Sequence, residues 1–315
     1  DLGRGRTLSL GDRFSRKKQG LPGPSNNQSF FSKLTTVNHI FNFSYSDPAA
    51  IGDNTAAEIE FRWHANESRF IDLVGNSGEI GLDREDNRNV TKKMSIDTSF
   101  TSYFGLNHEL FSSVVYAKER YQPWDRLEPL EQFLRSRRRS WTAKAEYRFR
   151  SDDDRFLGTA AAGREWVEST MPGDNPGYNW NLDPDNTHNE NLSDYSFGVR
   201  MRVRPSITFR ANAGSYYRLP SFFELFGDRG GVVGNTGLLP EEGFNWDAGV
   251  EWLFGSDKRP GRLGLTYFDT DIDDVIVFLM TAQGVAYPDN IAEAGTRGTE
   301  FTLDWSLTPR WSLSA

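Results

Sequence analysis

The residues best suited to bind a ligand lie in polar stretches between apolar segments. Arg135-Ser-Arg-Arg-Arg139 concentrates positive charge that would attract an anion. An alternative interpretation places Arg137 and Arg139 at a polar loop base, facing an interior. Aromatic rings in similar stretches could stack on a planar ligand. The candidate ligand-binding residues are Trp124, Arg135, Arg137, Arg139, Tyr178, Trp180, Arg218, Glu224 and Arg229.

Metal and catalytic chemistry find little support in the sequence. Asp269, Asp271, Asp273 and Asp274 are clustered carboxylates, but their spacing lacks the pattern of a calcium loop, and a solvated strand explains them better. The chain has no cysteine, and its four histidines are scattered. No nucleophile elbow, zinc-protease motif or phosphate loop occurs. We therefore expect no enzyme, no metal site and no cofactor.

Composition excludes further classes of protein. The chain has 315 residues, a formal net charge of −8 and a mean hydropathy of −0.62. The excess of acidic groups argues against nucleic acid as a partner. No apolar run reaches the length of roughly 18 residues that a transmembrane helix needs. Strands that alternate lipid-facing and water-facing side chains would escape that test, because the alternation averages the hydropathy.

Alternation with a period of two is the dominant pattern of the chain. From Tyr195 to Val203 every odd position is apolar, and the even positions carry Ser, Gly and Arg. The pattern resumes after Pro205-Ser206, which predicts a tight hairpin turn there. Similar segments begin near Ala57, Met94, Trp141, Trp246 and Thr299.

Three features favour a membrane barrel over a soluble sandwich or propeller. The alternating segments are about 10 to 14 residues long, which is near the length a tilted strand needs to cross a bilayer. Short links alternate with long polar links near residues 72–90, 122–136, 170–191, 219–242 and 281–294. Trp141 and Phe149 lie eight positions apart on one side, a separation of about 26 Å that suits two aromatic girdles.

The two ends of the chain suggest a piece of a larger protein. It begins at Asp1 without a signal segment, and it ends at Trp311-Ser-Leu-Ser-Ala315, which resembles the start of another strand. We count about twelve strands and the beginning of one more. A sheet in hydrocarbon must close on itself, so such a stretch would form part of a barrel.

From Tyr216 onward the chain resembles the barrel domain of TonB-dependent outer-membrane receptors. The similarity is carried by Tyr217-Arg-Leu-Pro-Ser-Phe-Phe-Glu-Leu-Phe-Gly227, by Gly234-Asn-Thr-Gly-Leu-Leu-Pro-Glu-Glu242, and by an Asn290 to Glu300 segment. These pieces occur in order over about 85 residues. Thr236-Gly237 and Thr296 depart from the family pattern without disturbing it. The matching positions expected to serve structure are Pro220, Gly227, Gly234, Asn235, Pro240, Glu241, Asn290, Gly298 and Glu300.

The resemblance implies an all-β, transmembrane, antiparallel up-and-down barrel of 22 strands, of which residues 1–315 would be the central part without the plug domain. It implies an outer-membrane receptor that imports an iron–siderophore complex, cobalamin or a similar scarce nutrient. The implied partners are that ligand, TonB with its inner-membrane energising complex, and outer-membrane lipid and lipopolysaccharide, whose phosphates the basic run could attract.

Two rival functions remain open. A passive diffusion porin would share the alternation and the girdles but would lack the ordered motifs from Tyr217 to Glu300. A soluble all-β enzyme, such as a sugar-cleaving propeller, would fold in water and would cover its apolar face with a second sheet.

Overall fold

The described part of the chain folds into thirteen antiparallel strands and one short helix. The computed structural model describes residues 5–21, 29–73, 84–127, 135–170, 187–227, 232–281, 285–308 and 310–315. The strands are β1 (Thr7–Gly20), β2 (Lys33–Asp47), β3 (Thr55–Asp72), β4 (Glu85–Phe104), β5 (His108–Asp125), β6 (Ser136–Arg150), β7 (Phe156–Thr170), β8 (Thr187–Arg204), β9 (Ile207–Arg218), β10 (Glu241–Ser256), β11 (Arg259–Met280), β12 (Ala286–Thr308) and β13 (Trp311–Ser314), and the helix is α1 (Phe222–Phe226).

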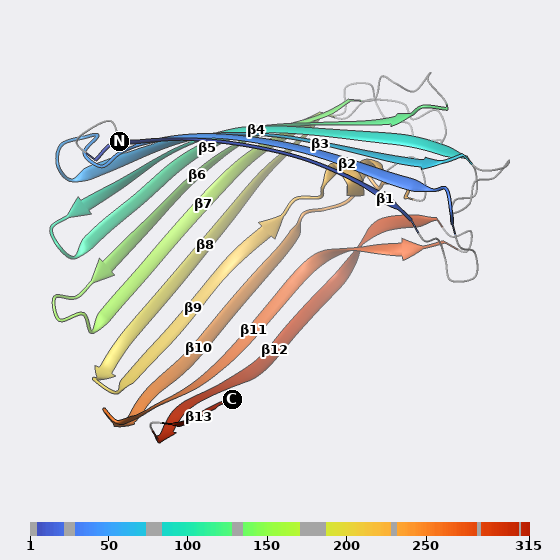
Figure 1. Cartoon of the computed structure of the whole chain (residues 1–315). Coiled ribbons are helices and arrows are strands. Elements are labelled where there is room, and N and C mark those ends of the chain that lie inside the picture. The colour runs from blue at the N-terminus through green and yellow to red at the C-terminus, as the bar shows by residue number, and fades with distance from the viewer. Residues whose placement is uncertain are drawn as a thin grey trace.

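All strands belong to one sheet in which each pairs with its neighbours in sequence, from β1 at one edge to β13 at the other. Figure 1 shows this sheet as a strongly curved wall, with α1 on its concave side. Within the described residues β1 and β13 do not pair with each other, so the sheet is open. The expected all-β, up-and-down architecture with twelve to thirteen strands is confirmed.

The two faces of the wall follow the alternation of the sequence. Tyr121 and Arg138 contact α1, so side chains in phase with them face the concave side, which we call inward. Trp141 and Trp166 are out of phase with these residues; they stand opposite each other on β6 and β7, with exposed fractions of 54% and 44%. In the described part of the chain no second sheet covers this outward apolar face. The layered packing of a soluble sandwich is therefore not found.

Short and long connections alternate along the chain, so the short ones lie at one end of the wall and the longer ones at the other. The predicted tight turn at Pro205-Ser206 joins β8 to β9. The long polar links are shorter in the structure than was predicted, because the neighbouring strands extend into them. Residues 85–90 belong to β4, and residues 286–294 belong to β12, so only residues 281–285 connect β11 to β12. Polar composition indicated loops there, but backbone pairing between neighbouring strands tolerates polar side chains on both faces.

The only helix among the described residues is α1, with five residues. None of the described helices has the length and apolar character needed to cross a membrane.

Candidate functional site

The connection from β9 to β10 turns inward and forms the main packed structure on the concave side. We call its described residues, 219–227 and 232–240, the ledge. It contains α1, which begins at a capping box: the Ser221 hydroxyl accepts from the Glu224 amide at 3.2 Å, and the Glu224 carboxylate accepts from the Ser221 amide at 2.7 Å. The sequence analysis missed this helix. The Ser221-x-x-Glu224 spacing was the available signal.

Two glycines allow the ledge to fold tightly. Gly227 ends α1 with φ of 68° and ψ of −164°, a conformation that other residues avoid. A Cβ atom at Gly227 would lie 2.1 Å from the carbonyl oxygen of Val232. A Cβ atom at Gly234 would lie 2.3 Å from the amide nitrogen of Phe226. Both positions therefore bring two stretches of backbone into direct contact.

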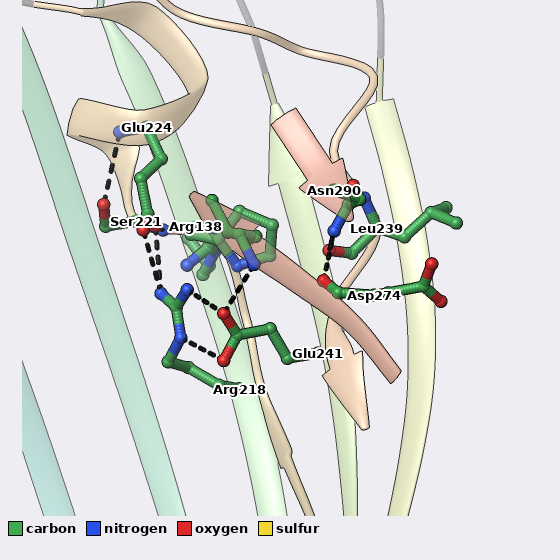
Figure 2. A network of polar contacts seen from close by, with 10 residues as sticks. Arg138, Arg218, Ser221, Glu224, Leu239, Glu241, Asp274 and Asn290 are labelled. Carbon is green, nitrogen blue, oxygen red and sulfur yellow. Dashed lines mark hydrogen bonds and ion pairs between the residues drawn. The ribbon is translucent and has the colours of Figure 1, made fainter. Parts of the chain in front are cut away.

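Arg218, the last residue of β9, fastens the ledge to the wall. Its Nε and Nη2 donate to the two carboxylate oxygens of Glu241 at 2.7 and 2.5 Å. Its Nη1 donates to both oxygens of Glu224 at 3.1 and 3.0 Å. Figure 2 shows the guanidinium group between the two carboxylates. One planar group thus joins β9, α1 and the first residue of β10 by charge-assisted hydrogen bonds.

The electrostatics of this cluster keep both carboxylates charged. Hydrogen bonds from Arg218 hold the pKa of Glu241 below its usual range. Burial alone would raise the pKa of Glu224, but hydrogen bonds from Arg218 and Ser221 outweigh it, so the pKa of Glu224 is also lowered. The bonds to Glu241 raise the pKa of Arg218. Glu241 also accepts from the backbone amide of Ile276 at 2.8 Å, which ties in β11.

Asparagine side chains attach the far end of the ledge to β11 and β12. The Asn290 carbonyl oxygen accepts from the Leu239 amide at 2.9 Å, and its amide nitrogen donates to the backbone carbonyls of Leu239 and Asp274. Asp274 has a positive φ of 54° at an irregular position of β11. Asn235 donates to the Pro288 carbonyl at 3.2 Å.

An apolar cluster fills the space between the ledge and the wall. Its buried members are Tyr121, Phe222, Leu225, Leu238 and Ile276. Tyr121 stacks on Phe222 with ring centroids 5.9 Å apart, and its hydroxyl donates to the Gly227 carbonyl at 2.8 Å. The cluster thus joins β5, the ledge and β11, which are distant in the sheet order.

Arg138 of β6 is the inward member of the basic run, and the sequence analysis did not select it. Its Nη2 donates to the Pro220 carbonyl at 2.8 Å, and its guanidinium lies 4.9 Å above the centre of the Phe222 ring. Burial lowers the pKa of Arg138, while Glu119, Glu190 and Glu165 oppose that effect. Arg138 lies three positions from Trp141 on the same strand, so the two side chains face opposite sides. If Trp141 faces outward, Arg138 must face inward, and this reasoning would have identified it.

A polar region of the inward wall lies beside the ledge. β9 pairs with β8 only as far as Gly214, opposite Ser196. Beyond Gly214, where β9 no longer pairs with β8, the Tyr217 hydroxyl donates to the Glu165 carboxylate of β7 at 3.0 Å. Burial raises the pKa of Glu190, and one carboxylate oxygen of Glu190 is buried without a hydrogen-bond partner. This wall therefore presents carboxylates and hydroxyls toward the interior.

The structure places the predicted ligand-binding residues in different environments. Trp124 lies within β5, and Arg137 and Arg139 lie within β6, not in loops. All three are out of phase with Tyr121 and Arg138 and so face outward. The inward placement considered for Arg137 and Arg139 was wrong, because Arg138 occupies that face.

Of the other candidates, Arg135 is exposed just before β6, and Arg218 and Glu224 pair with each other. Tyr178, Trp180 and Arg229 lie outside the described residues.

Most of the positions singled out by the family motif lie in the ledge or contact it. Pro220, Gly227, Gly234, Asn235, Glu241 and Asn290 make the contacts described above, and Pro240 directly precedes β10. Gly298 and Glu300 lie farther along β12, where the Phe268 ring covers Gly298. The described residues contain no group of acidic or histidine side chains arranged to hold a metal ion.

Comparison with known proteins gives one family for the whole chain. The family model "TonB dependent receptor-like, beta-barrel" matches residues 2–315. Transferrin-binding protein A of Neisseria meningitidis serogroup B is 41% identical over 73 residues, which is 23% of this chain and 7% of that protein.

Solved structures share the fold at low sequence identity. The copper transporter OprC aligns with a TM-score of 0.69 and 12% identity, covering 89% of this chain and 50% of that one. FpvA of P. aeruginosa, solved with heterologous pyoverdines, aligns with a TM-score of 0.65 and 13% identity over 100% of this chain and 46% of that one. The chain thus spans about half the length of these structures.

Proposed function

Because the chain belongs to the TonB-dependent receptor β-barrel family, we propose that it forms the central part of an outer-membrane receptor that imports an iron–siderophore complex. In this proposal the outward apolar face contacts lipid, and the long connections face the cell exterior. Residues 1–315 contribute barrel wall and ligand-capturing loops. A plug domain and a TonB-contacting segment would come from the rest of the protein, and import would be energised through TonB.

The observation that carries the proposal is the family match across residues 2–315, together with a curved wall whose apolar face is exposed. The choice of an iron ligand draws on the printed names of similar proteins, which include a pyoverdine-bound receptor and a transferrin-binding protein. OprC, a copper transporter, shows that the same fold serves other cargo.

The proposal assigns different parts to the candidate residues. Arg135, Tyr178, Trp180 and Arg229 remain proposed nutrient contacts in the loops. Arg218 and Glu224 serve the ledge, because each already satisfies the other. The ledge would present a rigid inner surface beside which a nutrient passes, and no bond of the nutrient needs to be made or broken.

Uptake by the full-length receptor tests the proposal. Cells that lack the receptor and cells that carry it would be given ⁵⁵Fe-labelled siderophores, haem, iron-loaded transferrin and labelled cobalamin. We expect receptor-dependent uptake of a ferric siderophore, abolished by an uncoupler and by loss of TonB. Uptake insensitive to both treatments would favour the passive porin instead.

A further inference from the structure

The outward side chains of β4, β5 and β6 form a basic patch made of Lys92, Lys118, Arg120, Arg137 and Arg139. Strand register places Lys92 opposite Arg120, and Arg120 opposite Arg137. Lys118 stands opposite Arg139 in the next outward row. Side chains directly opposite on neighbouring strands have Cβ atoms about 4.5–5.5 Å apart. The five cations therefore occupy one compact area.

The patch has too few anions of its own. Arg139 approaches Glu168 at 3.6 Å. Lys92, Lys118, Arg120 and Arg137 form no ion pair with any other described residue. Like charges directly opposite on a sheet destabilise it, so this arrangement favours an external anion.

The height of the patch on the wall identifies the occupant. The next outward row toward the apolar face holds Tyr116, Trp141 and Trp166. The rings of Tyr116 and Trp141 are in contact, with centroids 4.8 Å apart and an angle of 45° between their planes. Amphipathic rings in such a belt lie at the level of lipid headgroups. The patch fills the next two outward rows, farther from the hydrocarbon and on the side of the long connections. That is the level of the phosphate groups of the outer leaflet.

We infer that the basic patch binds the phosphate groups of the phosphorylated glycolipid in the outer leaflet. The guanidinium groups of Arg120, Arg137 and Arg139 suit bidentate contact with phosphate oxygens, and the lysines add point charges. The inference rests on the proposed function for the membrane location only. It gives the outward arginines a ligand different from the imported nutrient.

Outward charge on β10 to β12 is mostly of the opposite sign. Asp271 stands opposite Phe244, and Asp273 stands opposite Glu242 on β10 and Glu293 on β12. Arg297 of β12 is the outward cation there, opposite Asp269. The cluster of cations on β4 to β6 is therefore a local feature of the wall.

A triple variant of the full-length receptor tests the site. Lys118→Gln, Arg120→Gln and Arg137→Gln together remove three outward charges. The control, Arg13→Gln, Lys17→Gln and Lys93→Gln, removes three inward charges from β1 and β4. Both would be inserted in nanodiscs, checked for barrel assembly by heat-dependent gel migration, and titrated with bisphosphorylated lipid A, with fully dephosphorylated lipid A and with inorganic phosphate.

We expect the triple variant to bind bisphosphorylated lipid A on the order of a hundredfold more weakly than the unaltered receptor. The control should bind like the unaltered receptor, and dephosphorylated lipid A should bind both variants equally weakly. Three results would overturn the inference: an unchanged affinity in the triple variant, an equal loss in the control, or complete displacement of lipid A by millimolar inorganic phosphate.

Nutrient uptake separates this inference from the proposed function. Loss of uptake in the triple variant with unchanged lipid A binding would assign the patch to nutrient capture and would also overturn the inference. A receptor that binds lipid A through the patch but imports no nutrient would remove the proposed function and leave the glycolipid site standing.

Discussion

The guanidinium of Arg218 does what a lysine ammonium could not do in its place. It contacts four carboxylate oxygens, two from Glu241 and two from Glu224. A planar fork with five donors can serve two carboxylates at once, whereas an ammonium is a point donor. The identity of this residue therefore decides how firmly the ledge is attached.

Arg218→Lys should loosen the ledge by about 1–3 kcal/mol, because hydrogen bonds to charged groups are lost while the carboxylates remain. Hydrogen exchange of amides 221–227 in the full-length receptor measures the change. Arg210→Lys is the matched control, since Arg210 makes a single exposed contact with Glu251. Equal protection in the Arg218→Lys and Arg210→Lys receptors would contradict the bridging role.

Acid should weaken the same cluster in a defined range. The folded-state pKa values of Glu224 and Glu241 lie below the ordinary value of 4.5. A carboxyl group with a lowered folded pKa stabilises the fold above its unfolded pKa, and this contribution is lost as the pH falls through the folded value.

Amide protection of the ledge should therefore stay constant from pH 7 to about 5 and fall below about 4.5. Glu241→Gln should reduce the size of that fall. A loss of protection that begins near pH 7 would implicate a different group.

The side of the strand that each residue faces could have been predicted from the sequence, but it was predicted wrongly for the basic run. The basic run was noticed, yet Arg137 and Arg139 were selected while Arg138 makes the inward contacts. In an alternating strand an error of one position moves a side chain to the other face. The pairing of Arg218 with Glu241 could not be predicted, because the two residues are separated by a folded segment whose path depends on tertiary contacts.

At the scale of elements, the ledge depends on glycine where its backbone turns. Gly227→Ala should destabilise the ledge more than Gly105→Ala does. Both glycines have a positive φ, which costs another residue about 1–2 kcal/mol. Only at Gly227 would the added Cβ also meet the Val232 carbonyl, whereas nothing lies within 4 Å at Gly105.

Limited proteolysis and hydrogen exchange of residues 221–227 would reveal the difference. A ledge in the Gly227→Ala receptor that is as protected as that of the Gly105→Ala receptor would show that the close approach to Val232 is relaxed without cost.

The strands were predictable as elements, but their lengths were not. Apolar alternation identified the part of each strand that carries outward apolar side chains, such as Trp141 to Phe149 in β6. Beyond it, β11 continues to Met280, and β12 already begins at Ala286, within a stretch that was predicted to be a link. The alternation does not mark where these two strands end, because their extensions are held by backbone pairing with each other.

At the scale of the whole molecule, the two faces of the wall should respond oppositely to charge. Ala145→Arg places a cation on the outward face between Trp141 and Phe149, where it should cost about 2–4 kcal/mol in a bilayer. Thr142→Arg places the same group on the inward face of the same strand, where it should cost little.

The fraction of full-length receptor assembled in vesicles, followed by heat-dependent gel migration and urea titration, compares the two variants. Similar stability of both would mean that the outward face does not contact hydrocarbon.

The fold class as a whole followed from the sequence because alternation, segment length and loop spacing agreed with one another. The ledge did not follow from it. Its hydrogen bond from Tyr121 to Gly227 joins residues 106 positions apart, and such a contact exists only after the intervening strands are in place.

That hydrogen bond gives the ledge a geometric role. Between β5 and β11 the wall follows an arc, and the ledge spans the arc from one side to the other as a chord does. The number of paired strands fixes the length of this arc. An arc of fixed length whose chord is also fixed has only one radius. The curvature of this stretch is therefore set by its own internal strut, and these strands would hold the bend of a wide cylinder before the last seam of the cylinder is joined.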